Sequence, residues 1–245
     1  MDDIKEMYFS QTALRTYLSC PYRFKKRYID RLYWRYESDS IQLGSEFHLD
    51  MKRHFLGLPL SGKNSNLVSA ATMFLPMEAG KKYLPEYTLR YNDNSVKITV
   101  RYDLLVIGDT IEIYDWKVGK SKLNASKLAT DIQTQLYLYT MASAGQIIKK
   151  DMEPADISIT YFNPFHTSSP VHIDYDSYKL DKNRIYISGL VSRILKDSEY
   201  ALTTDKRKCI HCEYNRLCNG KSVSARSING QDSDLSWDDI EEISF

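Results

Sequence analysis

Residues 95–117 read S-V-K-I-T-V-R-Y-D-L-L-V-I-G-D-T-I-E-I-Y-D-W-K and contain two runs, Ser95–Ile107 and Thr110–Lys117, around Gly108-Asp109. Apolar and polar residues alternate along both runs, which is typical of β-strands. A third alternating run, Tyr87–Tyr91, comes before them, across an Asn-Asp-Asn turn. The sequence therefore predicts a three-stranded antiparallel meander.

Helices are predicted on both sides of this meander. Ser10 is a good capping residue for a helix that Pro21 interrupts after Cys20, and a short aromatic and basic helix follows. The other predicted elements are helices at 41–55, 67–84, 124–144 and 178–196 and strands at 157–162 and 171–175. This order indicates an α/β fold with a mixed central β-sheet flanked by helices.

The composition is that of one soluble domain of 245 residues, with 42% hydrophobic residues and a net charge of +1. No window approaches the 18 consecutive apolar residues of a membrane span. The N-terminal M-D-D-I-K-E is acidic where a secretory signal would be basic and then apolar. We therefore expect a cytoplasmic protein that does not enter a membrane.

The net charge conceals a difference between two parts of the chain. Residues 222–245 contain six acids and one base, so they carry −5 and the remaining body carries +6. The same segment is rich in Ser, Asp and Asn and poor in apolar residues. We predict one domain over residues 1–220 and an acidic, disordered tail over residues 221–245.

A pair of carboxylates is predicted on the meander. Asp103 and Asp115 lie five and six residues from the Gly108-Asp109 turn, so they can face each other across the hairpin. Lys117 shares a strand face with Asp115 because the two positions differ by two. Opposed like charges destabilise a sheet, and hard oxygen ligands suit Mg²⁺ or Mn²⁺. The alternative is a solvated sheet face with an Asp–Lys ion pair.

Two further motifs accompany the carboxylates. Gly44 and His48 form G-x-x-x-H on a predicted helix, and Gln133 and Tyr137 form Q-x-x-x-Y, with an overlapping register at 135 and 139. The order of His, Asp, D-x-K and Q-x-x-x-Y resembles the RecB-like branch of the PD-(D/E)XK nuclease superfamily. The resemblance implies a restriction-endonuclease-like fold and hydrolysis of phosphodiester bonds.

The resemblance also implies roles for individual residues. Its metal ligands would be His48, Asp103, Asp115 and the carbonyl of Trp116, although His48 could instead contact a phosphate. Lys117 would orient or activate the attacking water. Gln133 and Tyr137 would position the nucleic-acid strand and support the site.

The four cysteines form a second candidate site. Cys209, Cys212 and Cys218 have the spacing C-x2-C-x5-C, and Cys20 stands alone before Pro21. Four thiolates suit an iron-sulfur cluster or a structural zinc ion, although zinc more often binds two C-x-x-C pairs. The alternative is four ordinary reduced cysteines.

The cysteine spacing is similar to that of the iron-sulfur nuclease domains of AddB and of CRISPR-associated RecB-like exonucleases. This resemblance covers roughly residues 8–220. It implies a cluster of the 4Fe-4S type that joins the N-terminal and C-terminal segments.

A stretch near the N-terminus interleaves basic and aromatic residues. Lys and Arg attract phosphates, and unpaired bases stack on aromatic rings. The candidate DNA-binding residues are Tyr22, Arg23, Lys25, Lys26 and Arg27. The alternative is an amphipathic helix with core aromatics and solvated bases.

The final residues, D-D-I-E-E-I-S-F, resemble the acidic tips of single-stranded-DNA-binding proteins, which implies that they either recruit a protein partner or mask the basic stretch until DNA displaces them. The alternative is a solubilising tail.

Together these features favour a metal-dependent DNA nuclease that acts as an exonuclease on single-stranded DNA or DNA ends. The rival is a non-catalytic module that binds DNA ends or serves as a scaffold. A zinc-dependent hydrolase is the third choice, because four cysteines would leave no open position on a zinc ion.

Overall fold

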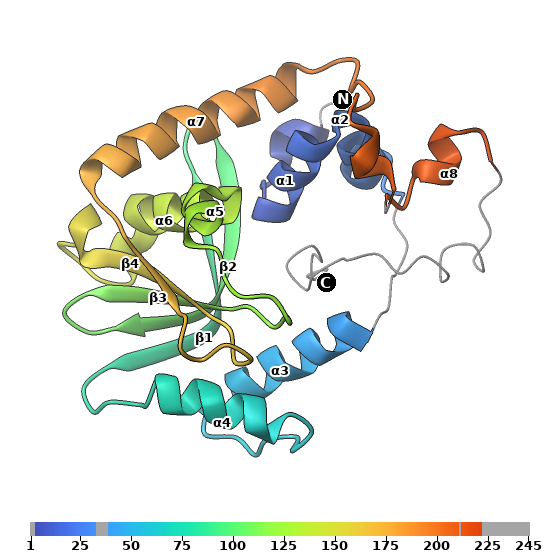
Figure 1. Cartoon of the computed structure of the whole chain (residues 1–245). Coiled ribbons are helices and arrows are strands. Elements are labelled where there is room, and N and C mark those ends of the chain that lie inside the picture. Colours follow the sequence, from blue (N-terminus) through green and yellow to red (C-terminus); the bar gives the residue numbers. More distant parts are fainter. Residues whose placement is uncertain (1–2, 33–38, 211, 222–245) are drawn as a thin grey trace.

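The computed structural model describes residues 3–32, 39–210 and 212–221. A five-stranded sheet with the order β1-β2-β3-β4-β5 forms its centre (Figure 1). Its strands are β1 (Lys82–Asn92), β2 (Lys97–Ile107), β3 (Ile111–Trp116), β4 (Ile157–Phe162) and β5 (Val171–Asp174). β3 and β4 are parallel, and the other three neighbouring pairs are antiparallel. The meander and the mixed α/β sheet are thus confirmed.

The helices follow the predicted order with two differences. They are α1 (Gln11–Ser19), α2 (Pro21–Phe24), α3 (Asp39–Phe55), α4 (Ser65–Phe74), α5 (Ala125–Thr130), α6 (Ile132–Ala144), α7 (Ser177–Lys196) and α8 (Asn215–Cys218), and a π-helical turn, Lys25–Ile29, follows α2. The helix predicted at 67–84 ends at Phe74, because Pro76 and Gly80 follow and Gly80 has a φ of 87°. The helix predicted at 124–144 is broken at Asp131, whose extended backbone begins α6.

Two hydrophobic cores lie on opposite faces of the sheet. Figure 1 shows α6 and α7 on one face and α3 and α4 on the other. The first core joins α1, α6 and α7 to the sheet through residues such as Leu14, Leu136 and Ile187. The second joins α3 and α4 to it through residues such as Phe47, Val68 and Phe162. The sheet is therefore buried on both faces, which fixes α3 and α6 on either side of it.

The side-chain alternation of β2 reverses at Asp103. Ile98 and Tyr102 belong to the core beneath α6, and continued alternation would place Leu104 there too. Leu104 instead belongs to the core beneath α3 and α4. On β1 the opposing residue is Glu86, which has a φ of 53°, a left-handed conformation that is uncommon for a residue with a side chain. Both strands are therefore kinked at this pair, a device that redirects side chains next to functional sites.

The N-terminal and C-terminal segments lie together. Tyr22 N donates to Ala201 O at 3.2 Å, and the Tyr214 hydroxyl donates to Leu32 O. Arg23 forms an ion pair with Glu213 at 2.8 Å. These contacts join the two ends of the domain.

Residues 222–245 of the predicted acidic tail, 221–245, lie outside the described residues, and so does the D-D-I-E-E-I-S-F segment with its predicted protein partner. No described helix is both long enough and apolar enough to span a bilayer.

Candidate active site at the end of strand β3

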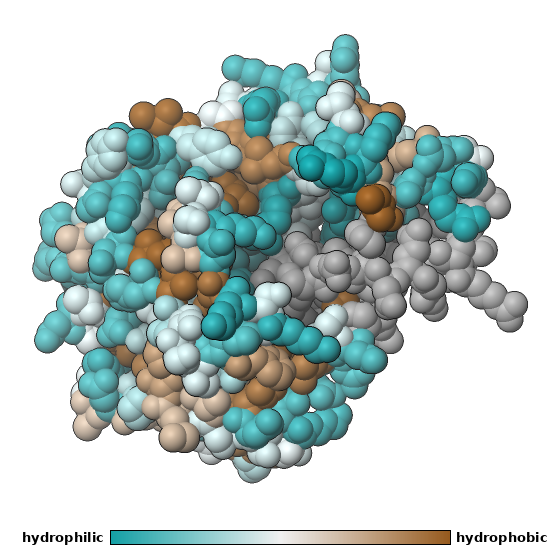
Figure 2. All heavy atoms as spheres, viewed as in Figure 1, coloured by the Kyte–Doolittle hydropathy of each residue, from teal (hydrophilic) through white to brown (hydrophobic). Residues whose placement is uncertain are grey.

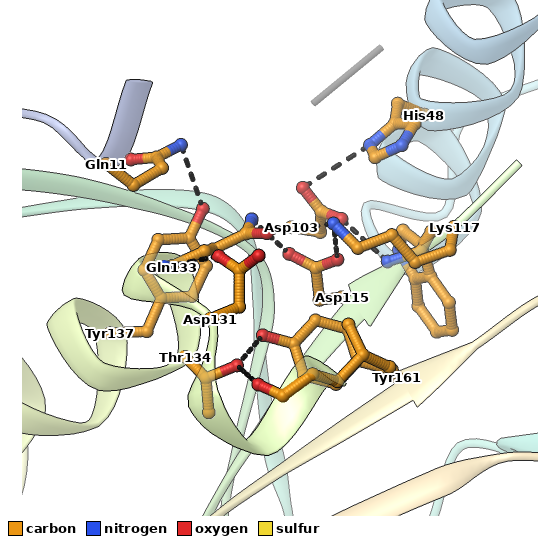
Figure 3. Close-up of polar contacts among 12 residues, drawn as sticks. Gln11, His48, Asp103, Asp115, Lys117, Asp131, Gln133, Thr134, Tyr137 and Tyr161 are labelled. Carbon is orange, nitrogen blue, oxygen red and sulfur yellow. Dashed lines mark hydrogen bonds and ion pairs between the residues drawn. The ribbon is translucent and has the colours of Figure 1, made fainter. Parts of the chain in front are cut away.

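The site lies where β3 ends, between α3 and α6 (Figure 3). The β2–β3 ladder runs from Ile107↔Ile111 to Leu104↔Tyr114, and its register makes Asp103 and Asp115 the next facing pair. On the other side of β2, Glu86 faces Asp103, between the paired positions 85↔104 and 87↔102. Three carboxylates therefore form one row across β1, β2 and β3.

Asp115 is bound by Lys117 and Gln133. The Lys117 ammonium is 2.7 Å from Asp115 Oδ2, and the Gln133 amide donates to Asp115 Oδ1 at 2.9 Å. Gln133 Oε1 accepts a hydrogen bond from Lys117 Nζ at 2.9 Å. A single amide thus fixes the carboxylate and the ammonium relative to each other, and Asp115 is only 1% exposed.

Asp103 faces α3 and contacts His48 and the backbone of β3. His48 Nδ1 is 3.3 Å from Asp103 Oδ1, and the backbone N–H of Trp116 donates to Asp103 Oδ2 at 2.8 Å. Glu86 Oε1 is 4.0 Å from His48 Nδ1, and Glu86 Oε2 is 3.0 Å from Arg101 Nε. The ligand atoms of His48, Glu86 and Asp103 lie within 4.8 Å of one another, close enough for one cation to bridge them.

Sequence reasoning missed Glu86, although the structure places it in the carboxylate row. It stands in the sequence L-P-E-Y, outside the motifs that identify the other residues. The only local signal is Pro85, which limits the pairing of this part of β1. Its position depends on the shared kink with Asp103, which is a tertiary feature.

The carboxylates determine the charge states around His48. Burial alone would lower the pKa of His48, but Asp103, Glu86 and Asp115 raise it above its ordinary value. Burial would raise the pKa of Asp103, but His48, the Trp116 N–H and Lys117 together lower it. Burial and the neighbouring Asp103 raise the pKa of Glu86. The row is thus a strongly negative environment that favours cations.

Trp116 and Tyr137 are held by the framework around the row. The Trp116 ring is 1% exposed and packs in the core beneath α3 and α4, so its main chain faces the carboxylates. The Tyr137 hydroxyl donates to Arg101 O at 2.6 Å, and Tyr137 O accepts from Tyr102 at 2.9 Å. Tyr137 therefore fastens α6 to β2 next to Asp103.

The two overlapping Q-x-x-x-Y registers lie in different surroundings. Gln133 reaches Asp115 and Lys117, as described above. Gln135 instead donates to Thr130 O at 3.1 Å, and the Tyr139 ring contacts Tyr91. The structure thus brings residues 133 and 137, and not 135 and 139, to the carboxylates.

The cysteines from both ends of the domain lie near one another. After burial, the thiols of Cys20 and Cys209 are the largest influences that raise the pKa of Cys218. Burial and Glu213 raise the pKa of Cys212 to about 12. Within residues 3–32, 39–210 and 212–221, however, no three thiols come within 4.8 Å of one another. The expected cluster is therefore not visible as a closed set of ligands.

The N-terminal basic residues mostly contact acidic residues of the protein itself. Arg23 and Arg27 approach Glu213 at 2.8 and 3.7 Å, and Lys26 lies 2.7 Å from Asp30. Lys26 also lies over the Tyr22 ring, at 5.0 Å. Phe24 in the same stretch is fully buried. The burial of Phe24 fits the amphipathic alternative, and the DNA-binding role of Tyr22, Arg23, Lys25, Lys26 and Arg27 stays a prediction.

The arrangement is suited to hydrolysis of a phosphate ester. Oxygen ligands from Asp103, Asp115 and Glu86 suit Mg²⁺ or Mn²⁺, and His48 adds a nitrogen ligand. An ammonium at Lys117 can stabilise negative charge that develops on a phosphate.

Comparisons with known proteins give one family and one fold. A model of the PD-(D/E)XK nuclease superfamily matches residues 8–74 and 69–219. A solved structure of a candidate exonuclease from Eubacterium rectale superposes with a TM-score of 0.55 at 11% identity, covering 91% of this chain and 93% of that one. The crystal structure of SSO0001 gives a TM-score of 0.49 at 16% identity and covers 88% and 87%. A comparison with curated proteins found no match.

Asp131 is the residue that begins α6 and thereby places Gln133. Its carboxylate accepts from Gln133 N at 2.8 Å and pairs with Arg15 of α1 at 2.8 Å. We expect Asp131→Ala to lower the free energy of unfolding by about 1–2 kcal/mol at pH 7, because the cap is lost. Chemical denaturation of the variant and the wild type measures this difference.

The acid dependence of stability tests the same residue. Burial opposes ionisation, but Arg15 and the Gln133 N–H lower the pKa of Asp131 below its usual value of 3.8. Its contribution is therefore complete above the unfolded-state pKa and is lost as the pH falls through the lower folded-state pKa. Asp131→Asn retains a capping oxygen, so it should restore much of the stability at pH 7 while flattening the dependence below pH 4. An unchanged acid dependence in both variants would contradict this assignment.

Proposed function

Because the chain belongs to the PD-(D/E)XK nuclease superfamily, we propose that it is a metal-dependent DNA nuclease that hydrolyses phosphodiester bonds. It acts as an exonuclease on single-stranded DNA or DNA ends, with Mg²⁺ or Mn²⁺ as the cofactor. The observation that carries this proposal is the row of Glu86, Asp103 and Asp115 with the Lys117 ammonium fixed beside it. The likeness in fold to the Eubacterium rectale protein supports the exonuclease assignment.

The donor set fits a divalent cation. Asp103, Asp115, Glu86, His48 and the carbonyl of Trp116 would hold the ion. When bound, such an ion makes water a stronger nucleophile at neutral pH and offsets negative charge on the phosphate. The carboxylates already lie together at a cost in repulsion, which a cation would relieve.

The chain's own groups position the reactants. Lys117 is held by Asp115 and Gln133, so its ammonium can orient the attacking water and stabilise charge on the phosphate oxygens. Gln133 acts through its two partners and is a positioning residue. Tyr137 holds α6 against β2, which keeps Gln133 within reach of Asp115.

The four cysteines would hold an iron-sulfur cluster of the 4Fe-4S type as a structural clasp. A single zinc ion held by the same four thiolates is the alternative clasp. A cubane cluster binds each sulfur to a different iron and accepts wider spacing. Cys20 on one side and Cys209, Cys212 and Cys218 on the other would join segments that already lie together.

Removing the charge of Asp115 should abolish cleavage. We expect Asp115→Asn to reduce the rate at least about 100-fold in Mg²⁺ or Mn²⁺, because the ion loses a ligand and Lys117 loses its partner. The double variant Asp115→Asn, Lys117→Met should also lose cleavage. Because it removes both charges, neither group is left buried without its partner. End-labelled linear DNA, single-stranded and duplex, measures the rate, and binding of the same DNA in EDTA should persist.

An equivalent substitution away from the site provides the control. Asp109→Asn lies in the β2–β3 turn and should cut at the wild-type rate. Circular single-stranded DNA should resist the wild-type enzyme, because an exonuclease needs an end. Full cleavage by a folded Asp115→Asn protein would refute the site. Binding without cleavage in any metal would instead favour the scaffold function.

Glu86 should contribute to metal affinity. We expect Glu86→Gln to weaken Mn²⁺ binding roughly 10-fold or more in isothermal titration calorimetry, because one anionic ligand becomes neutral. Glu112→Gln, on β3 toward the opposite end of the strand, is the matched control and should bind Mn²⁺ normally. Equal Mn²⁺ affinity in both variants would remove Glu86 from the ligand set.

Anaerobic purification tests the cluster. The protein should be brown and contain four irons per chain, and Cys218→Ser should lose colour and thermal stability. A colourless wild-type protein with one zinc ion per chain would replace the cluster by a zinc clasp. The chemistry of the carboxylate row does not depend on this result.

A further inference from the structure

The loop between β3 and α5 carries basic residues that the site described above does not use. It begins at Lys117 and contains Lys120 and Lys122, both of which are exposed. In Figure 1 this loop projects beyond the end of β3, beside the loop that follows β4, and hydrophilic side chains cover this region in Figure 2. Among the described residues, neither lysine forms an ion pair with an acid.

A buried asparagine on the neighbouring loop holds this loop in place. Asn163 is 2% exposed, and its amide nitrogen donates to Gly119 O at 2.8 Å and to Ser121 O at 3.0 Å. Its amide oxygen accepts from Phe165 N at 2.9 Å. Because both ends of the amide are bonded, its orientation is fixed by its partners.

The carbonyl of Lys120, which lies between Gly119 and Ser121, is also bound. His166 Nε2 lies 2.7 Å from Lys120 O, and a carbonyl oxygen only accepts, so Nε2 carries the hydrogen. The carbonyls of residues 119, 120 and 121 are thus all held by the loop that follows β4. The backbone that carries the two lysines is therefore fixed before any ligand arrives.

The N-terminal basic segment offers a contrast. Arg23, Arg27 and Lys26 each contact an acid of the protein, so a phosphate there would compete with those acids for the same donors. Lys120 and Lys122 need no such exchange. Lys120 and Lys122 also follow Lys117 by three and five residues, which places their Cα atoms within roughly 11 and 18 Å of it.

We propose that Lys120 and Lys122 bind backbone phosphates of a single-stranded nucleic acid beside the bond that is cut, and that Asn163 positions them. This inference rests on the nuclease function proposed above. Ammonium groups attract phosphates without reading base sequence, so the contact selects a nucleic-acid strand and sets its path toward Lys117.

The salt dependence of binding tests the two lysines. The probe is a fluorescent oligothymidylate in EDTA, with anisotropy measured over a range of KCl concentrations. Each phosphate contact on a single strand contributes about 0.7 to the slope of log K against log salt, so Lys120→Ala, Lys122→Ala should lower the slope by about 1.4. The affinity at low salt should fall roughly tenfold.

The control variant removes two positive charges from another part of the protein surface. Lys150→Ala, Lys182→Ala changes two exposed lysines, one after α6 and one on α7, and should leave the slope unchanged. Both double variants should retain the thermal stability of the wild type.

A double-mutant cycle tests the positioning role of Asn163. Asn163→Ala should lower the slope when both lysines are present and should change nothing further in the Lys120→Ala, Lys122→Ala protein. A merely structural role would weaken binding equally in both backgrounds, and that result would overturn the role of Asn163.

The outcomes separate this inference from the proposed function. Metal-dependent cleavage that needs Asp115, together with an unchanged slope in the Lys120→Ala, Lys122→Ala protein, would overturn the inference and leave the nuclease intact. A wild-type protein that neither binds nor cuts the oligonucleotide would overturn both. A smaller slope in this variant, with the control unchanged, would support the inference.

Discussion

Three acidic residues at facing positions on neighbouring strands must be neutralised, and the rest of the site supplies the groups that do so. Glu86, Asp103 and Asp115 face one another across three neighbouring strands, where like charges destabilise the sheet. The surrounding groups offset the repulsion between these carboxylates. His48 and the Trp116 N–H contact Asp103, and Lys117 and Gln133 contact Asp115. Because like charges in such a row cost stability, we propose that the row binds a cation.

The rest of the fold positions the side chains that contact the carboxylates. The two cores bury both faces of the sheet, so α3 brings His48 from one side while α6 brings Gln133 from the other. Asp131 breaks the helical segment and starts α6 at the position from which Gln133 reaches Asp115. The loop that continues from β3 is held by Asn163, so the exposed Lys120 and Lys122 lie on a positioned backbone that leads directly from Lys117.

The local sequence pattern was enough to predict those features of the fold and site that depend on a single hairpin or a single helix. Strand alternation and turn position were enough to bring Asp103 and Asp115 together, because hairpin register follows from turn position. Glu86 could not be found in this way, since it joins the row only through the kink that it shares with Asp103. The ion pair of Arg23 with Glu213 joins residues 190 positions apart, so no local pattern reveals that Arg23 is paired within the protein. The support from Asn163 is likewise a contact between two loops that are far apart in the sequence.

Thermal unfolding with and without Mn²⁺ shows whether the carboxylate row binds a cation, because an ion that binds only the folded protein must stabilise it. We expect saturating Mn²⁺ to raise the Tm of the wild-type protein above its value in EDTA. The same addition should leave the Tm of Asp103→Asn nearly unchanged. Equal Tm values for the wild-type protein in Mn²⁺ and in EDTA would contradict the claim that the carboxylate row is a cation site.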